Sequence, residues 1–493
     1  MDLYFSQRFD VEPELLVEHG AFNISVASDL PLFVDPFLLF NSEKDDYQEL
    51  HREILRYLGF LRDKALPDLE EGLIDDWYRF KEVRQNWLGF TVFGNEGAGL
   101  GTEFAFSLHE ALSDILSGFG EETITQGSHL EKLCLIKPGV GKDNISDFTT
   151  NLIKSYLLDY TEAFAREHLR EEHCETFQVA RAAFNYETQT WATKPYYLPR
   201  LDEPAGKVGQ KDYVLLTPFD MLTRDETWIS HSDMIANFYL LPEALPNEQQ
   251  REQVNRYLRD QLGRRPSAKE RVEAALRTVQ QFPELLDYYI RLKEDSGDQA
   301  EAVSTARVED TEQVLVRQVS RAIGDLEERT AFYELPWSTY KECLERVHFF
   351  KSYIEDNDGY KLLNRGDGEA FSKEAEVHLA FGLVWCKTEL DVNREPNNGR
   401  GPVDFKASYG SSAKSLIEFK LASNTRLKQN LEKQVKIYER ANGTRSSVKV
   451  IVYYTSAQEA RVNRILKELK LEEEESVVVI DARGDNKPSA STA

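Results

Sequence analysis

Residues 402–440 of the chain read PVDFKASYGSSAKSLIEFKLASNTRLKQNLEKQVKIYER. Apolar alternation and β-branched residues predict strands at 401–408 and 415–421. Apolar residues three or four positions apart predict a helix at 427–441. The segment therefore predicts two successive strands followed by a helix.

Five polar residues stand at regular places in these predicted elements. Asp404 lies in the first strand, while Glu418 and Lys420 are two residues apart in the second strand and so point to the same face. Gln434 and Tyr438 are four residues apart on the helix and lie one turn above each other. This arrangement allows all five side chains to converge on one edge of a sheet.

Further elements are predicted on both sides of this segment. A helix at 371–384 and a strand at 385–392 precede it, and a strand at 448–454, a helix at 457–469 and a strand at 476–480 follow it. The predicted order is α-β-β-β-α-β-α-β. The C-terminal part is therefore expected to be an α/β domain.

Three motifs in this part resemble those of the PD-(D/E)XK nuclease superfamily: Pro402-Val-Asp404, Glu418-Phe-Lys420 and Gln434-Val-Lys-Ile-Tyr438. The last resembles the QxxxY helix of one subgroup. The resemblance covers about a quarter of the chain and implies a restriction-endonuclease-like α-β-β-β-α-β core. One departure is Val403, which separates Pro402 from Asp404.

The resemblance implies roles for the polar residues. Asp404 and Glu418 would hold a divalent cation, and Lys420 would assist the attack on the substrate. The family also uses an acid from the first helix, for which Glu376 and Glu374 are both candidates. Carboxylate oxygens suit Mg²⁺, for which Mn²⁺ can substitute, and such an ion polarises a phosphate and activates a bound water. The implied activity is metal-dependent hydrolysis of phosphodiester bonds.

The local charge supports nucleic acid as the substrate. Residues 401–450 contain ten Lys and Arg against four Asp and Glu, in a chain whose net charge is −25. A basic region within an acidic protein is what contact with a phosphate backbone requires. The candidates for substrate binding are Gln434, Tyr438, Arg400 and Lys436. We expect DNA, with RNA as the alternative because the metal chemistry acts on either backbone.

The remaining sequence predicts two further parts. Residues 1–225 mix short β-rich runs with amphipathic helices and predict a mixed α/β domain, and 226–360 predict a helical connector. The turn-rich sequence EDNDGYKLLNRGDG at 355–368 marks the start of a nuclease-like domain at 361–484. Residues 485–493 are expected to be a disordered tail. The predicted fold class is multidomain α/β.

Composition excludes several classes of protein. A chain of 493 residues with 41% hydrophobic and 11% aromatic residues is neither disordered nor collagen-like. Four scattered cysteines without a CxxC motif argue against a disulfide framework and a thiolate zinc site. The absence of an apolar leader and of long apolar runs predicts a cytoplasmic protein that does not contact a membrane.

Two weaker signals lie in the N-terminal part. Asp35, Asp143 and Asp147 could form a second acidic site, but turn and cap roles explain these residues better. The apolar run at 130–136 predicts a strand. Neither signal changes the predicted function.

A nuclease joined to a large acidic region is similar to bacterial antiphage-defence effectors, in which a sensor restrains a toxic nuclease. By this analogy, residues 1–360 regulate the nuclease, form a homo-oligomer or bind a partner subunit. The alternative is a catalytically inactive nuclease fold that binds nucleic acid or scaffolds a defence or repair complex.

Overall fold

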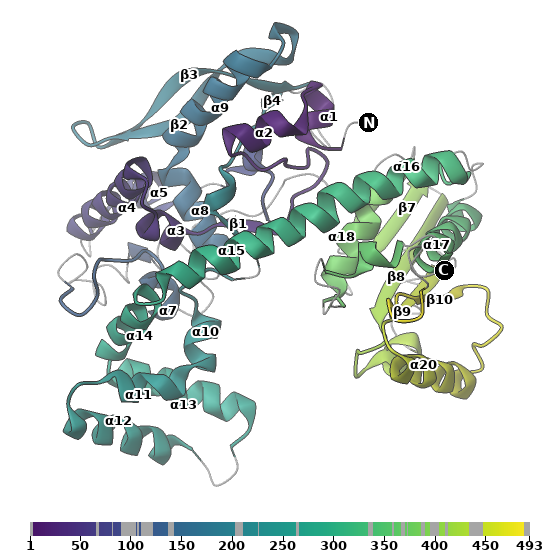
Figure 1. Ribbon diagram of the computed structural model, residues 1–493. Coiled ribbons are helices and arrows are strands. Elements are labelled where there is room, and N and C mark those ends of the chain that lie inside the picture. Colours follow the sequence, from purple (N-terminus) through teal and green to yellow (C-terminus); the bar gives the residue numbers. More distant parts are fainter. Residues whose placement is uncertain are drawn as a thin grey trace.

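The structure is a computed structural model that combines helices with three sheets (Figure 1). It describes residues 3–65, 69–80, 82–89, 105, 108–109, 122–136, 142–202, 211–224, 226–262, 266–333, 339–356, 359–365, 370–371, 373–385, 390–394, 404–409, 413–432 and 447–487. Within these ranges, no helix is both long enough and apolar enough to cross a lipid bilayer.

The N-terminal part surrounds two small antiparallel sheets with helices. The helices are α1 (Phe5–Phe9), α2 (Pro13–His19), α3 (Pro36–Asn41), α4 (Asp45–Asp63), α5 (Glu71–Tyr78), α7 (Lys132–Ile136), α8 (Lys142–Leu152) and α9 (Lys154–His168), with short 3-10 turns at Arg84–Asn86, Glu171–His173 and Phe219–Met221. One sheet pairs β2 (Cys174–Asn185), β3 (Thr190–Leu201) and β4 (Asp212–Tyr213), and the other pairs β1 (Leu32–Val34) with β5 (Leu222–Arg224).

Apolar spacing explains how these helices pack. In α4, Leu50, Ile54, Leu58 and Leu61 recur every three or four residues, and all four are buried. Asp35 caps α3, because its Oδ1 accepts a hydrogen bond from the Phe37 N–H at 3.0 Å. This confirms the predicted cap role of Asp35.

The middle region is helical and leads into one long rod. Its elements are α10 (His231–Ala236), a 3-10 turn (Phe238–Leu240), α11 (Leu241–Ala244), α12 (Glu248–Gln261), α13 (Ala268–Gln281) and α14 (Glu284–Glu294). The rod joins α15 (Gly297–Thr311), the π-helical segment η5 (Glu312–Gln318) and α16 (Val319–Arg329). In Figure 1 it runs from the helical middle region to the C-terminal sheet, packing against β5 along α15 and against α18 along α16.

The C-terminal part is a five-stranded mixed sheet with helices. Its elements are α17 (Thr339–Asp356), the 3-10 turn η6 (Gly359–Leu363), α18 (Glu374–Trp385), β6 (Asp391–Arg394), β7 (Phe405–Tyr409), β8 (Ala413–Leu421), β9 (Ser447–Tyr453), α20 (Ser456–Leu469) and β10 (Val477–Asp481). The strand order is β10-β9-β8-β7-β6. Strands β6, β7 and β8 are antiparallel neighbours, whereas β8, β9 and β10 run parallel.

Three features differ from the sequence predictions. Residues 130–136 contain helix α7 rather than a strand, because a short apolar run does not distinguish the two by its pattern. Helix α18 continues to Trp385, so the strand predicted from 385 begins only at Asp391. The hairpin of β2 and β3, with 12 residues in each strand, was not predicted.

Helix α17 packs against β7, β8, β9 and β10 of the C-terminal sheet. Its buried residues include Cys343, Val347, Phe350 and Ile354. The domain boundary predicted at residue 361 lies after α17, although α17 packs with the sheet of the C-terminal part.

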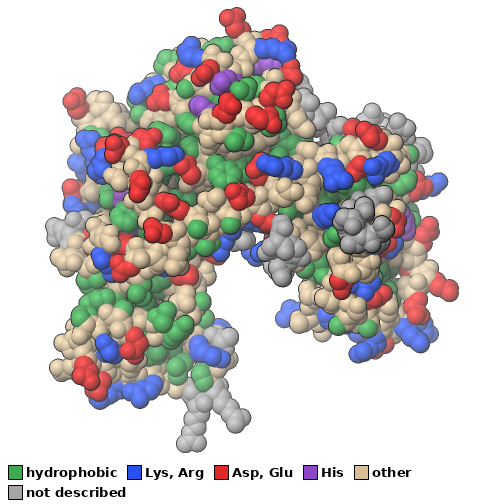
Figure 2. Space-filling view, viewed as in Figure 1, with side chains coloured by type: hydrophobic (Ala, Val, Ile, Leu, Met, Phe, Trp, Pro, Cys, Tyr) green, Lys and Arg blue, Asp and Glu red, His purple; other side chains and the backbone are tan. Residues whose placement is uncertain are grey.

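The surface charge is mixed. In the view of Figure 2, acidic and basic side chains alternate over most of the molecule, and hydrophobic side chains gather on the helical middle region. Tyr239 and Leu240, which follow α10, are 69% and 43% exposed.

Candidate active site on the C-terminal sheet

Strands β7 and β8 bring Asp404 and Glu418 together. Phe405 pairs with Ile417 across the two antiparallel strands, so continuing the register places Asp404 opposite Glu418. Asp404 stands directly before β7, and its Oδ2 accepts a hydrogen bond of 2.6 Å from the Phe419 N–H. The backbone of β8 therefore fixes the carboxylate of Asp404.

The ammonium of Lys420 lies among three carboxylates. Its Nζ is 3.3 Å from Oε1 of Glu418, 3.4 Å from Oε2 of Glu374 and 3.5 Å from Oδ2 of Asp404. The same atom donates a hydrogen bond of 2.7 Å to the Phe419 carbonyl. One buried cation thus balances acids that come from α18, from the start of β7 and from β8.

The first turns of α18 contribute two residues to this site. Besides contacting Lys420, Glu374 accepts hydrogen bonds from the Leu421 N–H at 3.3 Å and from Asn424 Nδ2 at 3.1 Å. One turn later, Nε2 of His378 lies 3.4 Å from Oδ2 of Asp404. His378 was not singled out from the sequence, although its position four residues after Glu374 places both on one helix face.

Burial and neighbouring charges shift the pKa values of the acids in opposite directions. Burial alone would raise the pKa of Asp404, but His378, Lys420 and the Phe419 N–H lower that pKa below its usual value. Burial raises the pKa of Glu418 to about 7. The neighbouring Asp404 adds to the rise in the pKa of Glu418, whereas Lys420 opposes it.

The lysine responds to the same surroundings. Burial would lower the pKa of Lys420, but the carboxylates of Asp404, Glu418 and Glu374 raise that pKa above its usual value. Lys420 is therefore a charged ammonium at neutral pH.

The site contains one buried oxygen that lacks a partner. Oε2 of Glu418 is buried and makes no hydrogen bond to the part of the chain that the structure describes. A buried carboxylate oxygen without a partner is unfavourable, so it marks a place for a cation or a hydrogen-bond donor. Within the same ranges, no three His, Cys, Asp or Glu side chains form a metal-binding group. The Lys420 ammonium lies within 3.5 Å of all three acids.

The other candidate from the first helix lies elsewhere. Oε1 of Glu376 accepts hydrogen bonds from Arg224 at 2.7 Å and from Arg365 at 3.3 Å. Of the two glutamates that sequence spacing left open, the structure therefore places Glu374 beside Lys420 and Glu376 in a separate ion-pair network. The four candidates for substrate binding, Gln434, Tyr438, Arg400 and Lys436, lie outside the described residues.

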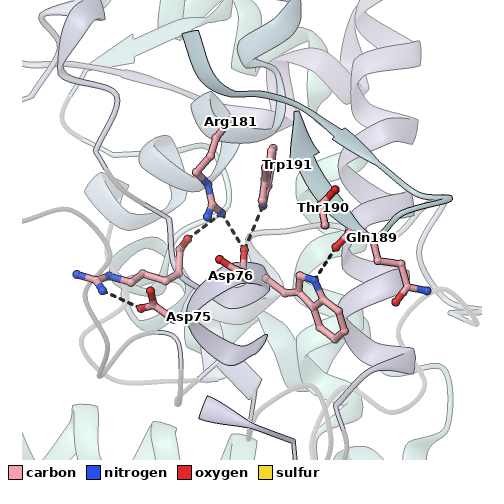
Figure 3. Close-up of a pocket in the computed structure, with 8 residues that line it drawn as sticks. Asp75, Asp76, Arg181, Gln189, Thr190 and Trp191 are labelled. Carbon is pink, nitrogen blue, oxygen red and sulfur yellow. Dashed lines mark hydrogen bonds and ion pairs between the residues drawn. The ribbon is translucent and has the colours of Figure 1, made fainter. Parts of the chain in front are cut away.

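A separate pocket of about 350 Å³ lies between the β2–β3 hairpin and the end of α5 (Figure 3). Arg181 and the Trp191 indole point toward the backbone of α5, where both donate hydrogen bonds to the Asp76 carbonyl, at 3.0 and 3.1 Å. The Trp77 indole donates to the Gln189 carbonyl at 2.9 Å. These contacts attach the hairpin to the helix, so we assign the pocket a structural role.

Two family profiles match this chain. Residues 10–230 match one described as "Domain of unknown function (DUF8370)", and residues 339–456 match one described as "Domain of unknown function (DUF8371)". The second match begins at α17 and includes Asp404, Glu418 and Lys420. No curated protein and no solved structure matches the chain.

Proposed function

We propose that the C-terminal part is a Mg²⁺-dependent nuclease of the PD-(D/E)XK type that hydrolyses DNA. The observation that carries the proposal is the position of the Lys420 ammonium, within 3.5 Å of carboxylate oxygens of Asp404, Glu418 and Glu374. Three acids and one lysine where α18 meets the neighbouring strands β7 and β8 suit metal-assisted attack on a phosphate.

The arrangement of the strands supports the same proposal. An antiparallel run of β6, β7 and β8, followed by β9 parallel to β8, agrees with the α-β-β-β-α-β core that the motif resemblance implies. Residues 427–432, between β8 and β9, are helical, as that order requires. The site lies where α18 meets β8, which are in contact.

The residues of the site fit a divalent cation. Asp404 and Glu418 would hold the ion, with Glu374 within reach, and the unpartnered Oε2 of Glu418 offers a ligand atom. When bound, Mg²⁺ polarises the scissile phosphate and lowers the pKa of a bound water. Lys420 supplies a second positive charge, which stabilises negative charge that develops on the phosphate. Nε2 of His378 lies 3.4 Å from the same Oδ2 atom of Asp404 that Lys420 approaches.

The proposal also covers residues 1–360. We place the protein in the cytoplasm and assign residues 1–360 a regulatory or partner-binding role, for which the contacts of α15 with β5 and of α16 with α18 provide a physical path. The likeness to antiphage-defence effectors remains a prediction.

Cleavage assays with the purified full-length protein test the proposal. Linear, circular and single-stranded DNA, together with RNA, are incubated with Mg²⁺, Mn²⁺ or EDTA. The variants are Asp404→Asn and Glu418→Gln, with Glu459→Gln on the surface of α20 as a matched control. We expect DNA cleavage that needs the metal and is lost in the first two variants only.

Two other outcomes of the cleavage assay would change the proposal. Cleavage of RNA but not of DNA would show that RNA, rather than DNA, is the substrate. DNA binding without cleavage under all conditions would support the alternative of an inactive nuclease fold that binds or scaffolds.

A further inference from the structure

Arg224, the last residue of β5, is a buried cation that joins three parts of the chain. Its Nη1 donates a hydrogen bond of 2.8 Å to Oδ2 of Asp310 in α15, and its Nη2 donates one of 2.7 Å to Oε1 of Glu376 in α18. The Arg224 side chain is only 5% exposed. The Arg307 guanidinium also donates to the Arg224 carbonyl at 3.3 Å.

These contacts link the two regions that match family profiles. Arg224 lies in the first matched region and Glu376 in the second, while Asp310 belongs to the long rod between them. In Figure 1 the rod passes beside α18, in agreement with the contacts between α16 and α18. Arg224 is therefore an N-terminal side chain that reaches directly into the C-terminal part.

Glu376 is held from several directions. Besides Arg224, its Oε1 accepts a hydrogen bond from Arg365 at 3.3 Å, and its Oε2 accepts one from the Lys373 N–H at 3.1 Å. Two guanidinium groups, of Arg224 and Arg365, thus face two carboxylates, of Glu376 and Asp310. Arg224 and Glu376 at the centre of this network are buried, and a buried network of ion pairs tolerates little movement of its members.

The same turn of α18 carries residues of the candidate active site. Glu374 precedes Glu376 by two positions and contacts Lys420, and His378 follows by two positions and contacts Asp404. Residues two apart on a helix point in different directions, so one face of this turn meets the active site while the other meets Arg224. A shift of the α18 backbone at Glu376 therefore moves Glu374 and His378 with it.

We propose that Arg224 is a positioning residue for the candidate active site and acts through Glu376 on the first turn of α18. This inference rests on the proposed function. It assigns the N-terminal part a supporting role in catalysis, because the active-site helix is held in place from outside its own domain. Residues around a metal site commonly orient its ligands, and misplacement by about 1 Å can reduce rates about a hundredfold.

Conservative variants of the full-length protein test this role. Removing one partner of a buried ion pair can unfold a domain, so the test uses Glu376→Gln and Arg224→Lys, which preserve size or charge. The matched control is Glu342→Gln in α17. Glu342 forms a similarly buried pair with Arg346, at 2.9 Å, with side chains 2% and 3% exposed.

Three quantities beyond stability are measured for each variant: kcat and KM for DNA cleavage, and the Kd for Mn²⁺ by calorimetry without DNA. For Glu376→Gln we expect kcat to fall about tenfold or more, KM to stay within about threefold, and the Mn²⁺ Kd to rise about tenfold. The kcat and the Mn²⁺ Kd of Arg224→Lys should lie between those of Glu376→Gln and those of the wild type. Glu342→Gln should lower Tm to a similar degree while leaving kcat and the Mn²⁺ Kd within about twofold of the wild type.

The outcomes separate this inference from the proposed function. If the wild type binds Mn²⁺ and cleaves DNA, and Glu376→Gln does both equally well, the positioning role is wrong and the proposed function stands. The same conclusion follows if Glu376→Gln and Glu342→Gln lose activity and Mn²⁺ affinity to the same extent. If the wild type neither binds Mn²⁺ nor cleaves nucleic acid, the proposed function fails and the positioning role fails with it.

Discussion

The Nζ atom of Lys420 lies 3.4 Å from Oε2 of Glu374, although 46 positions separate the two residues in the sequence. Lys420 projects from β8, and Glu374 stands in the first turn of α18. Their contact is one of the bonds that hold the helix onto the sheet. The candidate active site is thus shared between two elements, and its geometry depends on what holds α18 in place.

Substituting Lys420 tests its role as the counter-charge of the three acids. In Lys420→Ala, the carboxylates of Asp404, Glu418 and Glu374 lose their shared cation and repel each other. We expect turnover to fall about a hundredfold, without a loss of metal affinity. The rise in Tm on adding Mg²⁺ should exceed that of the wild type, because the ion then supplies the missing charge. Thermal unfolding with Mg²⁺ and with EDTA measures this difference.

The control for this variant is Lys428→Ala, which removes an exposed lysine that pairs with Glu468. It should behave like the wild type. A large loss of Mg²⁺ binding in Lys420→Ala would contradict the assigned role. It would show that the lysine is needed for metal binding, and not only for turnover.

His378 is expected to support the carboxylate of Asp404. In His378→Gln, the ring nitrogen 3.4 Å from Oδ2 of Asp404 is lost. We expect the Kd for Mn²⁺ to rise about tenfold, as for other groups that orient metal ligands. His348→Gln, on the exposed face of α17, is the control. Equal Mn²⁺ affinities in the two variants would show that His378 only fills space.

Asp147 predicts a pH dependence of stability in the N-terminal part. Burial, together with Glu82 and Asp143, raises the pKa of Asp147 to about 7. Because folding raises the pKa of this acid, its contribution to stability is present at low pH and is lost as the pH rises toward 7. A tenfold difference in acid dissociation between the folded and unfolded chains corresponds to about 1.4 kcal/mol of unfolding free energy.

The variant Asp147→Asn has no such proton to lose. It should therefore be more stable than the wild type at pH 8 and close to the wild type at pH 4, as measured by urea unfolding. Asp260→Asn, on the exposed side of α12, should show no difference between the two pH values. If Asp147→Asn is no more stable than the wild type at pH 8, other contacts compensate the charge of the buried acid.

Helix α17 is expected to be indispensable to the C-terminal domain. A fragment that starts at 361 lacks the buried side chains of Val347, Phe350 and Ile354, which pack over the sheet. Losing several large apolar contacts destabilises a domain by several kcal/mol. A fragment 339–493 should give a cooperative thermal transition, whereas 361–493 should be insoluble or unfold without one. Equal transitions in the two fragments would show that α17 is only an attached connector.

The sequence was most informative about the residues that lie close together along the chain. The sequence placed Glu418 and Lys420 in one strand and Asp404 in the preceding strand, and the prediction that these three side chains converge is confirmed. Asp404 itself stands directly before β7 rather than within it. Strand periodicity places Glu418 and Lys420 on one face. Their contact with Asp404 depends in addition on the pairing of β7 with β8.

Contacts between distant elements could not be predicted in the same way. Glu374 and Glu376 lie on the same predicted helix, and the choice between them depends on how α18 is rotated against the sheet. In the structure Glu376 contacts Arg224, which is 152 positions away and carries no motif. The β2–β3 hairpin was missed for a similar reason, since its half-buried strands mix polar and apolar residues without a clear period.

The most direct test of the proposed metal site is the initial rate of DNA cleavage by the full-length wild type and by an Asp404→Asn/Glu418→Gln double variant, each with Mg²⁺ and with EDTA. We expect Mg²⁺-dependent cleavage by the wild type and its loss in the double variant, with thermal unfolding of both proteins measured alongside to show that the variant is folded. Equal cleavage by the two proteins, or cleavage that persists in EDTA, would contradict the assignment of these residues as a metal-dependent active site.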